Sequence, residues 1–199
     1  MSFSVAEIRK DFPIFERTIR DGKRLVYLDS GATSQKPWSV INAESDFYSK
    51  HNAAVHRGAH QLAEEATDAY EGARAIVAKF LGAKDSEIIF TKNATESINA
   101  VAYAMGNAAP GNRFALTSSD SIVVTEMEHH ANLIPWQELA RRTGAQLKWF
   151  KVGQDSRLDL SNIDQVITAN TKVVAITHQS NVLGTIIPLD AIVKRAHEV

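Results

Sequence analysis

The feature that most constrains this chain is a regular alternation of strand-like and helix-like segments that begins at Glu87. Short runs rich in β-branched and aromatic residues are each followed by a segment with apolar residues at spacings of three and four. This alternation predicts an α/β fold with a mostly parallel sheet and helices on both faces. The expected strands are 87–91, 122–125, 146–150 and 171–177, and the expected helices are 95–105, 132–142, 161–168 and 189–199.

The chain before Glu87 is predicted to be mainly helical. Ser4 and Glu7 have the spacing of a capping box, which predicts a helix that reaches about Asp11. Asp21-Gly22 predicts a turn within Arg20 to Lys23. The other expected elements are a strand over 25–28, a helix from Pro37 to Tyr48, and a helix over 62–81 with Leu62, Ala66, Tyr70, Ala73, Val77 and Phe80 on one face.

Composition excludes several classes of protein. The 199 residues hold 22 Lys and Arg against 23 Asp and Glu, so the chain offers no strongly basic face for nucleic acid. No apolar run approaches the roughly 20 residues that span a bilayer, and charges from Glu7 to Asp11 interrupt any signal sequence. The absence of Cys excludes disulfide scaffolds and thiol catalysis within this chain. We therefore expect a cytoplasmic protein without nucleic-acid or membrane partners.

The last helix predicts that the chain is the front part of a longer protein. Leu189, Ile192, Val193 and Ala196 form a helical stripe that runs to Val199 with no Gly, Asn or Pro to end it. A crossover helix should lead to another parallel strand, and none follows here. We expect the fold to be truncated before its C-terminal half.

Polar loops follow the expected strands, and ligands of open α/β sheets bind at the carboxyl ends of strands. The loop of Phe90 to Asn99 leads into a helix that opens with Thr95 and Glu96. Free amides and hydroxyl groups at a helix N-terminus favour a phosphate or carboxylate ligand. The alternative is an ordinary N-cap made by Asn93 or Thr95. The chain has no glycine-rich dinucleotide or phosphate-loop motif.

The second polar loop, Thr125 to Trp136, gathers Glu126, Glu128, His129 and His130. A metal is conceivable there, because imidazole and carboxylate groups are good ligands. Adjacent histidines in one loop seldom reach the same ion, so the open alternatives are a histidine satisfied by backbone groups and one that faces a cofactor as an aromatic surface or proton carrier.

The third polar loop, Thr177 to Gly184, offers Asn181 as a donor and acceptor, and Gly184 permits a tight turn. His56 and His60 stand four residues apart near the N-terminal helices. Gly58 between them weakens a helix and therefore a shared metal site. We expect no metal site in this chain.

Four motifs together resemble a known family. They are YLDSGATSQKP at Tyr27 to Pro37, AAVHRGAH at Ala53 to His60, EMEHHANLIPWQ at Glu126 to Gln137, and ITHQSNVLGT at Ile176 to Thr185. In this order and spacing they resemble the group II cysteine desulfurases, the SufS-like and selenocysteine-lyase-like branch of the class V aminotransferases. The resemblance implies a homodimeric enzyme of the PLP-dependent transferase fold type I. Members are roughly twice as long as this chain.

The resemblance also implies roles for individual residues. His129 matches a histidine whose ring stacks on pyridoxal 5′-phosphate (PLP), and His56 matches a second active-site histidine. Thr95, with Ala94 and Glu96 beside it, matches the segment that holds the cofactor phosphate. Asn181 matches an asparagine near the cofactor ring and the substrate carboxylate. Gly31 and Ala32 match a loop that lines the substrate pocket, and His130 is expected to support its own loop.

Residues 1–24 are expected to belong to a small domain, and 25–199 to the first part of the PLP-binding large domain. Family members usually carry Arg-Gly-Thr-Thr-Glu where this chain has Lys92 to Glu96, so one hydroxyl is lost at Ala94. The stretch from Ala108 to Ser121 is longer than usual. The Schiff-base Lys, the Asp that pairs with the pyridinium nitrogen and the Cys that forms a persulfide match no residue of this chain.

The implied reaction removes sulfur from L-cysteine and leaves L-alanine and an enzyme persulfide for a sulfur-acceptor or scaffold protein of iron–sulfur cluster assembly. We expect the 199-residue chain to be inactive alone. A selenocysteine lyase or a cysteine sulfinate desulfinase of the same family is an alternative. A non-catalytic α/β binding module is another. The sequence that follows residue 199 in the gene would discriminate between a module and an enzyme.

Overall fold

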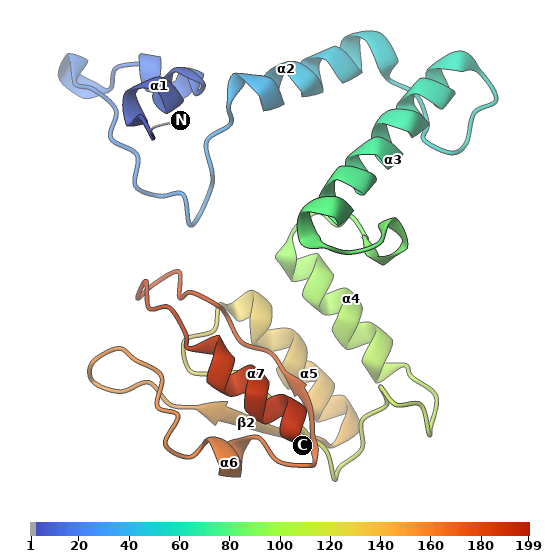
Figure 1. The fold of residues 1–199 in the computed structure, drawn as a ribbon, viewed down its shortest axis with the longest axis vertical. Coiled ribbons are helices and arrows are strands. Elements are labelled where there is room, and N and C mark those ends of the chain that lie inside the picture. The colour runs from blue at the N-terminus through green and yellow to red at the C-terminus, as the bar shows by residue number, and fades with distance from the viewer. Residues whose placement is uncertain (1–2) are drawn as a thin grey trace. The chain divides into compact units, whose positions relative to one another are not determined.

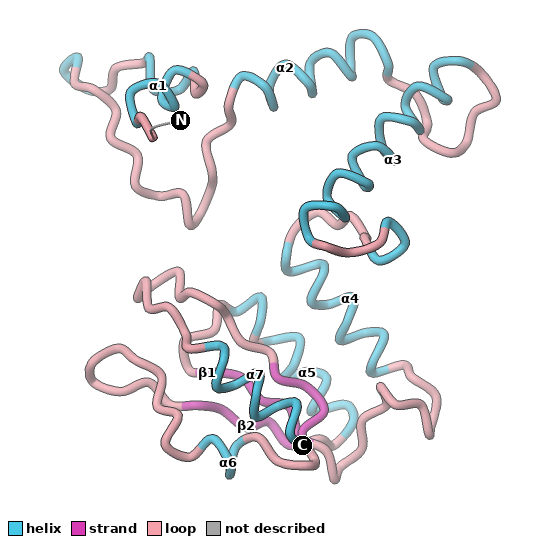
Figure 2. Tube along the Cα trace, in the orientation of Figure 1, coloured by secondary structure: helices cyan, strands magenta, loops and turns pink. Residues whose placement is uncertain are grey.

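A computed structural model of the chain describes residues 3–199. The chain divides into two compact units, Met1–Ile89 and Phe90–Val199. The first unit is helical and the second holds a three-stranded sheet (Figures 1 and 2). Within residues 3–199, no helix combines the length and the apolar character that crossing a bilayer requires. The expected division at residue 24 remains a prediction.

The first unit contains three α-helices joined by short helical turns. Its elements are α1 (Val5–Lys10), η1 (Pro13–Glu16), η2 (Arg20–Gly22), α2 (Trp38–Asp46), the π-helical turn η3 (Phe47–His51), α3 (Gln61–Leu81) and η4 (Asp85–Glu87). The expected start of α1 is confirmed, because the Ser4 hydroxyl accepts a hydrogen bond from the Glu7 amide at 3.4 Å. The expected turn is also present, with Asp21 at a φ of 61° and Gly22 at 68°.

Two expected strands are wrong. Residues 25–28 and 87–91 form no strand, and Val26, Leu28 and Ile89 are 72%, 92% and 83% exposed. Ile88 has extended backbone angles, so the local preference for strand geometry is present. A strand also needs a neighbouring strand to share its backbone hydrogen bonds, and neither segment is paired with one within the described residues.

Helix α3 agrees with its expected range to within one residue, but its buried face is different. The buried residues are Ala63, Ala66 and Ala78. Leu62 and Phe80, which we expected on one face together with Ala66, are 45% and 87% exposed. Apolar residues lie on several sides of this helix, so periodicity predicts the helix without fixing which side packs.

The second unit contains a parallel sheet, as expected, and its strand order is β2-β1-β3. Its elements are α4 (Ala94–Gly106), β1 (Ser121–Thr125), η5 (His130–Asn132), α5 (Ile134–Thr143), β2 (Gln146–Phe150), α6 (Ile163–Val166), β3 (Thr171–Val174) and α7 (Leu189–Glu198). Strand β1 pairs with β2 from Ser121 opposite Gln146 to Thr125 opposite Phe150. Its pairing with β3 is shorter and shifts between Ser121 and Ile122.

Helices cover both faces of this sheet, which confirms the expected arrangement. Successive side chains of a strand point to opposite faces. Ile122 and Val124 pack with residues of α4 and α5, whereas Val123 packs with Phe150 and with residues of α6 and α7. In Figure 1, α7 lies in front of the strands and α5 behind them. All five residues of β1 are buried.

The core on the α7 side depends on Phe150, whose side chain is fully buried. Replacing it with Ala removes a large apolar side chain and leaves a cavity, so we expect Phe150→Ala to lower the free energy of unfolding of this chain by about 3–5 kcal/mol. Trp149→Ala, at the neighbouring and 49% exposed position, is the matched control. Urea unfolding measures both. Equal losses in the two variants would contradict this account of the core.

Candidate functional site

The loop that follows β1 is anchored by the side chain at the end of the strand. The Thr125 hydroxyl donates a hydrogen bond to Oε1 of Glu128 at 2.8 Å and accepts one from the Met127 amide at 3.2 Å. Thr125 is buried, whereas His129 and His130 a few residues later are exposed. The fold therefore leads directly from a buried strand to two accessible imidazole groups.

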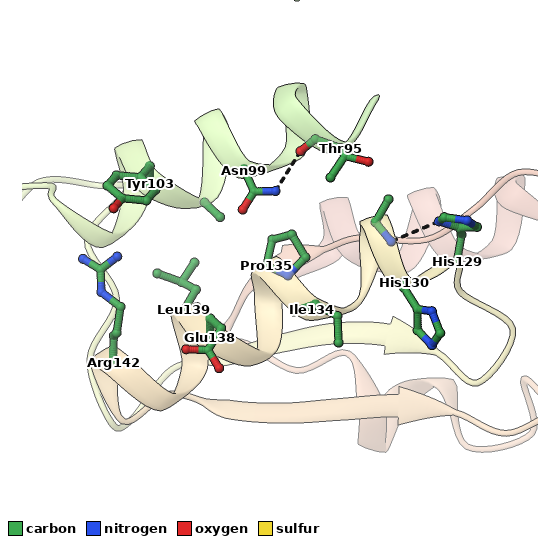
Figure 3. Close-up of a pocket in the computed structure, with 12 residues that line it drawn as sticks. Thr95, Asn99, Tyr103, His129, His130, Ile134, Pro135, Glu138, Leu139 and Arg142 are labelled. Atoms are coloured by element: carbon green, nitrogen blue, oxygen red, sulfur yellow. Dashed lines mark hydrogen bonds between the residues drawn. The ribbon is translucent and has the colours of Figure 1, made fainter. Parts of the chain in front are cut away.

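The orientation of His129 fixes the chemistry that its ring offers. Nδ1 accepts a hydrogen bond from the Ala131 amide at 3.0 Å, which Figure 3 draws as a dashed line. An imidazole nitrogen that accepts from an N–H carries no proton, so neutral His129 holds its proton on Nε2. Within residues 3–199, Nε2 makes no hydrogen bond. The ring thus presents an aromatic face and one free N–H group.

The N-terminus of α4 is an ordinary N-cap and also leaves groups free for an anion, so it combines the two alternatives that its sequence left open. Asn93 is the N-cap, because its Oδ1 accepts from the Glu96 amide at 2.9 Å. The Glu96 carboxylate accepts from the Lys92 amide at 2.6 Å. Within the described residues, the amides of Ala94 and Thr95 have no acceptor, and the Thr95 hydroxyl makes no hydrogen bond. The cap is an ordinary one, yet it leaves two amides and a hydroxyl free for an anion.

Thr95 and His129 line the same hollow, which lies between α4 and α5 and has a volume of about 420 Å³. Thr95, His129 and His130 gather at one end of it in Figure 3, and Tyr103 and Arg142 at the other. Its middle is apolar, with Ile134, Pro135 and Leu139 among its lining residues. We call this space the first hollow.

Asn181 lies in a second hollow of about 450 Å³, which His129 and His130 also line. The loop around Asn181 is held by Ser180, a buried residue whose hydroxyl accepts from the amides of Val182 and Leu183 at 3.3 and 3.1 Å. The Asn181 side chain makes no hydrogen bond within the described residues. The structure therefore places Thr95 and Asn181 each in a hollow shared with His129.

His56, Gly31 and Ala32 belong to the first unit. His56 has a φ of 61°, its Nε2 lies 3.0 Å from Oε1 of Glu71, and its amide donates to the Thr67 hydroxyl at 3.0 Å. Gly31 and Ala32 lie in a turn in which the Ala32 amide donates to the Asp29 carbonyl at 3.1 Å. The roles expected for these three residues remain predictions.

Three of the four histidines that raised the question of a metal have other partners. His60 accepts a weak hydrogen bond from the Ala63 amide at 3.4 Å and caps α3, whereas His56 pairs with Glu71. The rings of His129 and His130 are 6.3 Å apart and tilted by 58°. Among residues 3–199, no group of three or more His, Asp or Glu side chains is placed to hold a metal ion.

Sequence reasoning missed Glu128 as a residue that shapes the site. Its carboxylate contacts the last residue of β1, Thr177 in the segment after β3, and Asn132 at the end of η5. The sequence shows an acidic residue next to His129, but it gives no sign of these partners. The nearest signal is the placement of a Glu three residues after the end of a strand whose apolar residues predict burial.

Comparison with known proteins identifies the family. The model of the family described as aminotransferase class-V matches residues 26–199. The chain therefore belongs to the class-V aminotransferase family. A probable cysteine desulfurase of Streptomyces coelicolor is 58% identical over 193 residues, and the probable cysteine desulfurase 2 of Mycobacterium leprae is 54% identical over 198 residues. These matches cover 96% and 98% of this chain and 46% of each relative.

Solved structures of cysteine desulfurases have the same fold. The apo enzyme of Thermococcus onnurineus superposes with a TM-score of 0.86 at 38% identity, and CsdA of Escherichia coli with 0.77 at 36%. Both comparisons cover 100% of this chain, and 46% and 47% of the solved chains. The expected fold, the PLP-dependent transferase fold type I, is confirmed. Class-V aminotransferases and cysteine desulfurases in general use PLP.

The ion pairs around His56 predict a pH dependence of stability. The pKa of Glu71 lies below its ordinary value of 4.5, mainly because the Arg74 guanidinium donates a hydrogen bond to it, with a further contribution from His56. A carboxyl group whose pKa is lowered on folding stabilises the fold above its unfolded pKa, and that stabilisation is lost as the pH falls through the folded pKa.

We therefore expect Glu71→Gln to reduce stability at pH 7 and to flatten the loss of stability below about pH 5. Urea unfolding between pH 7 and pH 3 measures this effect. Glu64→Gln is the control, because this residue of the same helix has no ion-pair partner within residues 3–199. A parallel offset at all pH values for Glu71→Gln would contradict the expectation.

Proposed function

We propose that the full-length protein is a PLP-dependent cysteine desulfurase that converts L-cysteine to L-alanine and leaves the sulfur as an enzyme persulfide. The observation that carries the proposal is the position of His129. It lies at the carboxyl end of the central strand and lines two hollows, one containing the α4 N-terminus and the other Asn181. The similarity of this chain to named cysteine desulfurases supports the same substrate.

The residues at the first hollow fit the chemistry of PLP. Two free amides and the Thr95 hydroxyl at the start of a 13-residue helix suit a phosphate group, because the helix dipole favours a negative charge there. The exposed ring of His129 suits a flat aromatic partner. Ala94 would contribute its amide. Glu96 has its amide bonded to Asn93, so we propose that it supports the cofactor by holding this turn.

When bound, PLP draws electrons from the α-carbon of an amino acid. His129 would move a proton through Nε2, because an imidazole nitrogen can both donate and accept a proton. Asn181 would use its free amide to orient the substrate carboxylate. Gly31 and Ala32 would line the substrate pocket, and His56 would complete the site as a second imidazole. These assignments follow the matched motifs.

We further propose that the enzyme is a cytoplasmic homodimer that passes its sulfur to an acceptor or scaffold protein of iron–sulfur cluster assembly. The chain has no Cys, and the lysine and aspartate that the family uses have no match here, so we propose that these 199 residues are inactive alone. Assay of the full-length protein with L-cysteine, selenocysteine and cysteine sulfinate tests the proposal. Turnover of L-cysteine to alanine and sulfide supports it, and turnover restricted to another substrate overturns it.

The phosphate assignment predicts a specific defect. A hydrogen bond to a charged group contributes about 1.5–3 kcal/mol, so we expect Thr95→Ala to weaken PLP binding by the full-length protein by about tenfold to a hundredfold. Equilibrium binding is measured by cofactor absorbance in a background without the lysine that holds PLP covalently. Thr95→Ser is the control, since it keeps the hydroxyl. Equal affinity of Thr95→Ala and the parent would refute the assignment.

The two adjacent histidines predict different effects. Positioned acid–base catalysis contributes about 10²–10⁴-fold, so we expect His129→Ala in the full-length protein to lower kcat within this range and to shift the cofactor absorbance. His130→Ala should leave the absorbance nearly unchanged. Spectra and turnover rates of both variants test this difference. A spectrum perturbed by His130→Ala and untouched by His129→Ala would show that the roles are reversed.

A further inference from the structure

The carboxylate of Glu128 lies where three segments of the second unit meet. Oε1 accepts hydrogen bonds from the Thr125 hydroxyl at 2.8 Å and from the Thr177 amide at 2.9 Å. Oε2 accepts one from Nδ2 of Asn132 at 2.8 Å. Glu128 is half-buried, and Thr125 is almost fully buried. A single side chain thus joins the end of β1, the segment after β3 and the approach to α5.

The bond between Glu128 and Asn132 closes the loop that carries both histidines. The two residues are four apart, and His129, His130 and Ala131 lie between them. Ala131 in turn donates its amide to Nδ1 of His129. One hydrogen bond therefore joins the two ends of the loop, and a second one, inside the loop, orients the ring of His129.

The same carboxylate connects this loop to the one that carries Asn181. Thr177, whose amide binds Glu128, also donates its hydroxyl to the Gln179 carbonyl at 2.9 Å. The next residue, Ser180, holds the turn around Asn181. The relative position of His129 and Asn181 in the second hollow thus depends on Glu128.

The network has a fixed direction of donation. The indole N–H of Trp136 is a donor and cannot accept, and it donates to Oδ1 of Asn132 at 2.9 Å. Asn132 must then turn its Nδ2 toward Glu128, so position 128 has to accept there. The Thr177 amide is also a donor. All three groups donate to Glu128 here, and the Thr177 amide and Nδ2 of Asn132 can only donate. Position 128 must therefore accept on both of its side-chain atoms, and a carboxylate is acceptor-only.

A glutamine at this position cannot satisfy all three partners. If its oxygen faces Thr125 and Thr177, its amide N–H₂ faces the N–H₂ of Asn132. If the amide is flipped, N–H₂ faces the backbone N–H of Thr177. Either orientation sets two donors against each other and leaves half-buried polar groups unpaired, although the size of the side chain is unchanged.

We propose that Glu128 is the positioning residue of the site, which sets the ring of His129 and the loop of Asn181 around the cofactor. This inference rests on the proposed function, because it assigns Glu128 a role in holding residues against PLP. Glu128 acts through the loops that it joins. A displacement of about 1 Å of a catalytic group in such a site lowers the rate by about a hundredfold.

The network predicts that a second substitution can restore the hydrogen bonds that Glu128→Gln breaks. When Glu128→Gln is combined with Asn132→Asp, the new carboxylate at position 132 accepts from Trp136 and from the side-chain amide introduced at position 128. The oxygen of that same amide still accepts from Thr125 and Thr177. The double variant keeps the net charge and restores every donor to an acceptor. Asn132→Asp alone sets two carboxylates against each other, so it should be as harmful as Glu128→Gln alone.

The experiment uses the full-length protein and compares the parent, both single variants and the double variant. We measure PLP affinity, the cofactor absorbance and the NMR signal of the Trp136 indole N–H, assigned with Trp136→Phe. Each single variant should lose about tenfold to a hundredfold in PLP affinity or in kcat and shift the indole signal, and the double variant should recover most of each loss.

Asp120→Asn is the matched control. Asp120 also binds a threonine, with Oδ2 accepting from the Thr117 amide at 2.7 Å and hydroxyl at 2.8 Å, but it lies before the amino end of β1. An asparagine oxygen can accept both bonds. Asp120→Asn should leave the cofactor absorbance unchanged. That result would show that the effect of Glu128→Gln comes from the position of the lost carboxylate and not from the loss of a loop carboxylate in general.

Several outcomes would overturn the inference. Glu128→Gln with parental affinity, absorbance and kcat is one, and a double variant with the summed defects of the single variants is another. If Glu128→Gln does not fold, the double variant decides: parental PLP binding supports the inference, and weak binding or failure to fold overturns it. A parent that binds no PLP overturns the proposed function and this inference with it, whereas an active parent with an unaffected Glu128→Gln overturns this inference alone.

Discussion

The parallel pairing of β1 with a strand on each side is the interaction on which the second unit depends. All five of its residues are buried, and its three apolar side chains, Ile122, Val123 and Val124, alternate between two separate apolar clusters. A strand in this position receives backbone hydrogen bonds at both edges and packs helices on both faces. Its direction therefore fixes the end at which each following loop emerges. The loop with His129 and the segment after β3 emerge at the same edge of the sheet, because parallel strands share their carboxyl ends.

The site is then completed by polar contacts rather than by apolar packing. At the α4 N-terminus, Asn93 binds one amide, and two further amides stay free. The loop after β1 is shaped by the Glu128 carboxylate, which accepts hydrogen bonds from three segments. Buried or half-buried polar groups require partners of the opposite kind. The positions of His129 and Asn181 are thus set by which neighbours donate and which accept.

The sequence was sufficient for elements whose signal is local. Helices α3, α4 and α5 and strands β1 and β2 lie within a residue or two of their expected ranges, since periodicity and capping act over a few neighbouring residues. The segments 25–28 and 87–91 failed as strands because pairing depends on a distant partner. Thr95 and His129 could be placed near the ends of elements from the pattern of strands and helices, whereas Asn181 lies in the loop well beyond β3. Glu128 could not be recognised, because its partner Thr177 is 49 residues away.

The buried character of β1 also has a consequence for biosynthesis. Ser121 contacts Thr171 across 50 residues of chain, so one edge of β1 stays unpaired until that length has been translated. At about 5–20 residues per second, the interval lasts a few seconds. During that time an apolar strand with an open edge is exposed to other nascent chains, and such edges are prone to aggregate. The chain is therefore expected to depend on chaperones as it leaves the ribosome, and slower translation after β2 would increase that dependence.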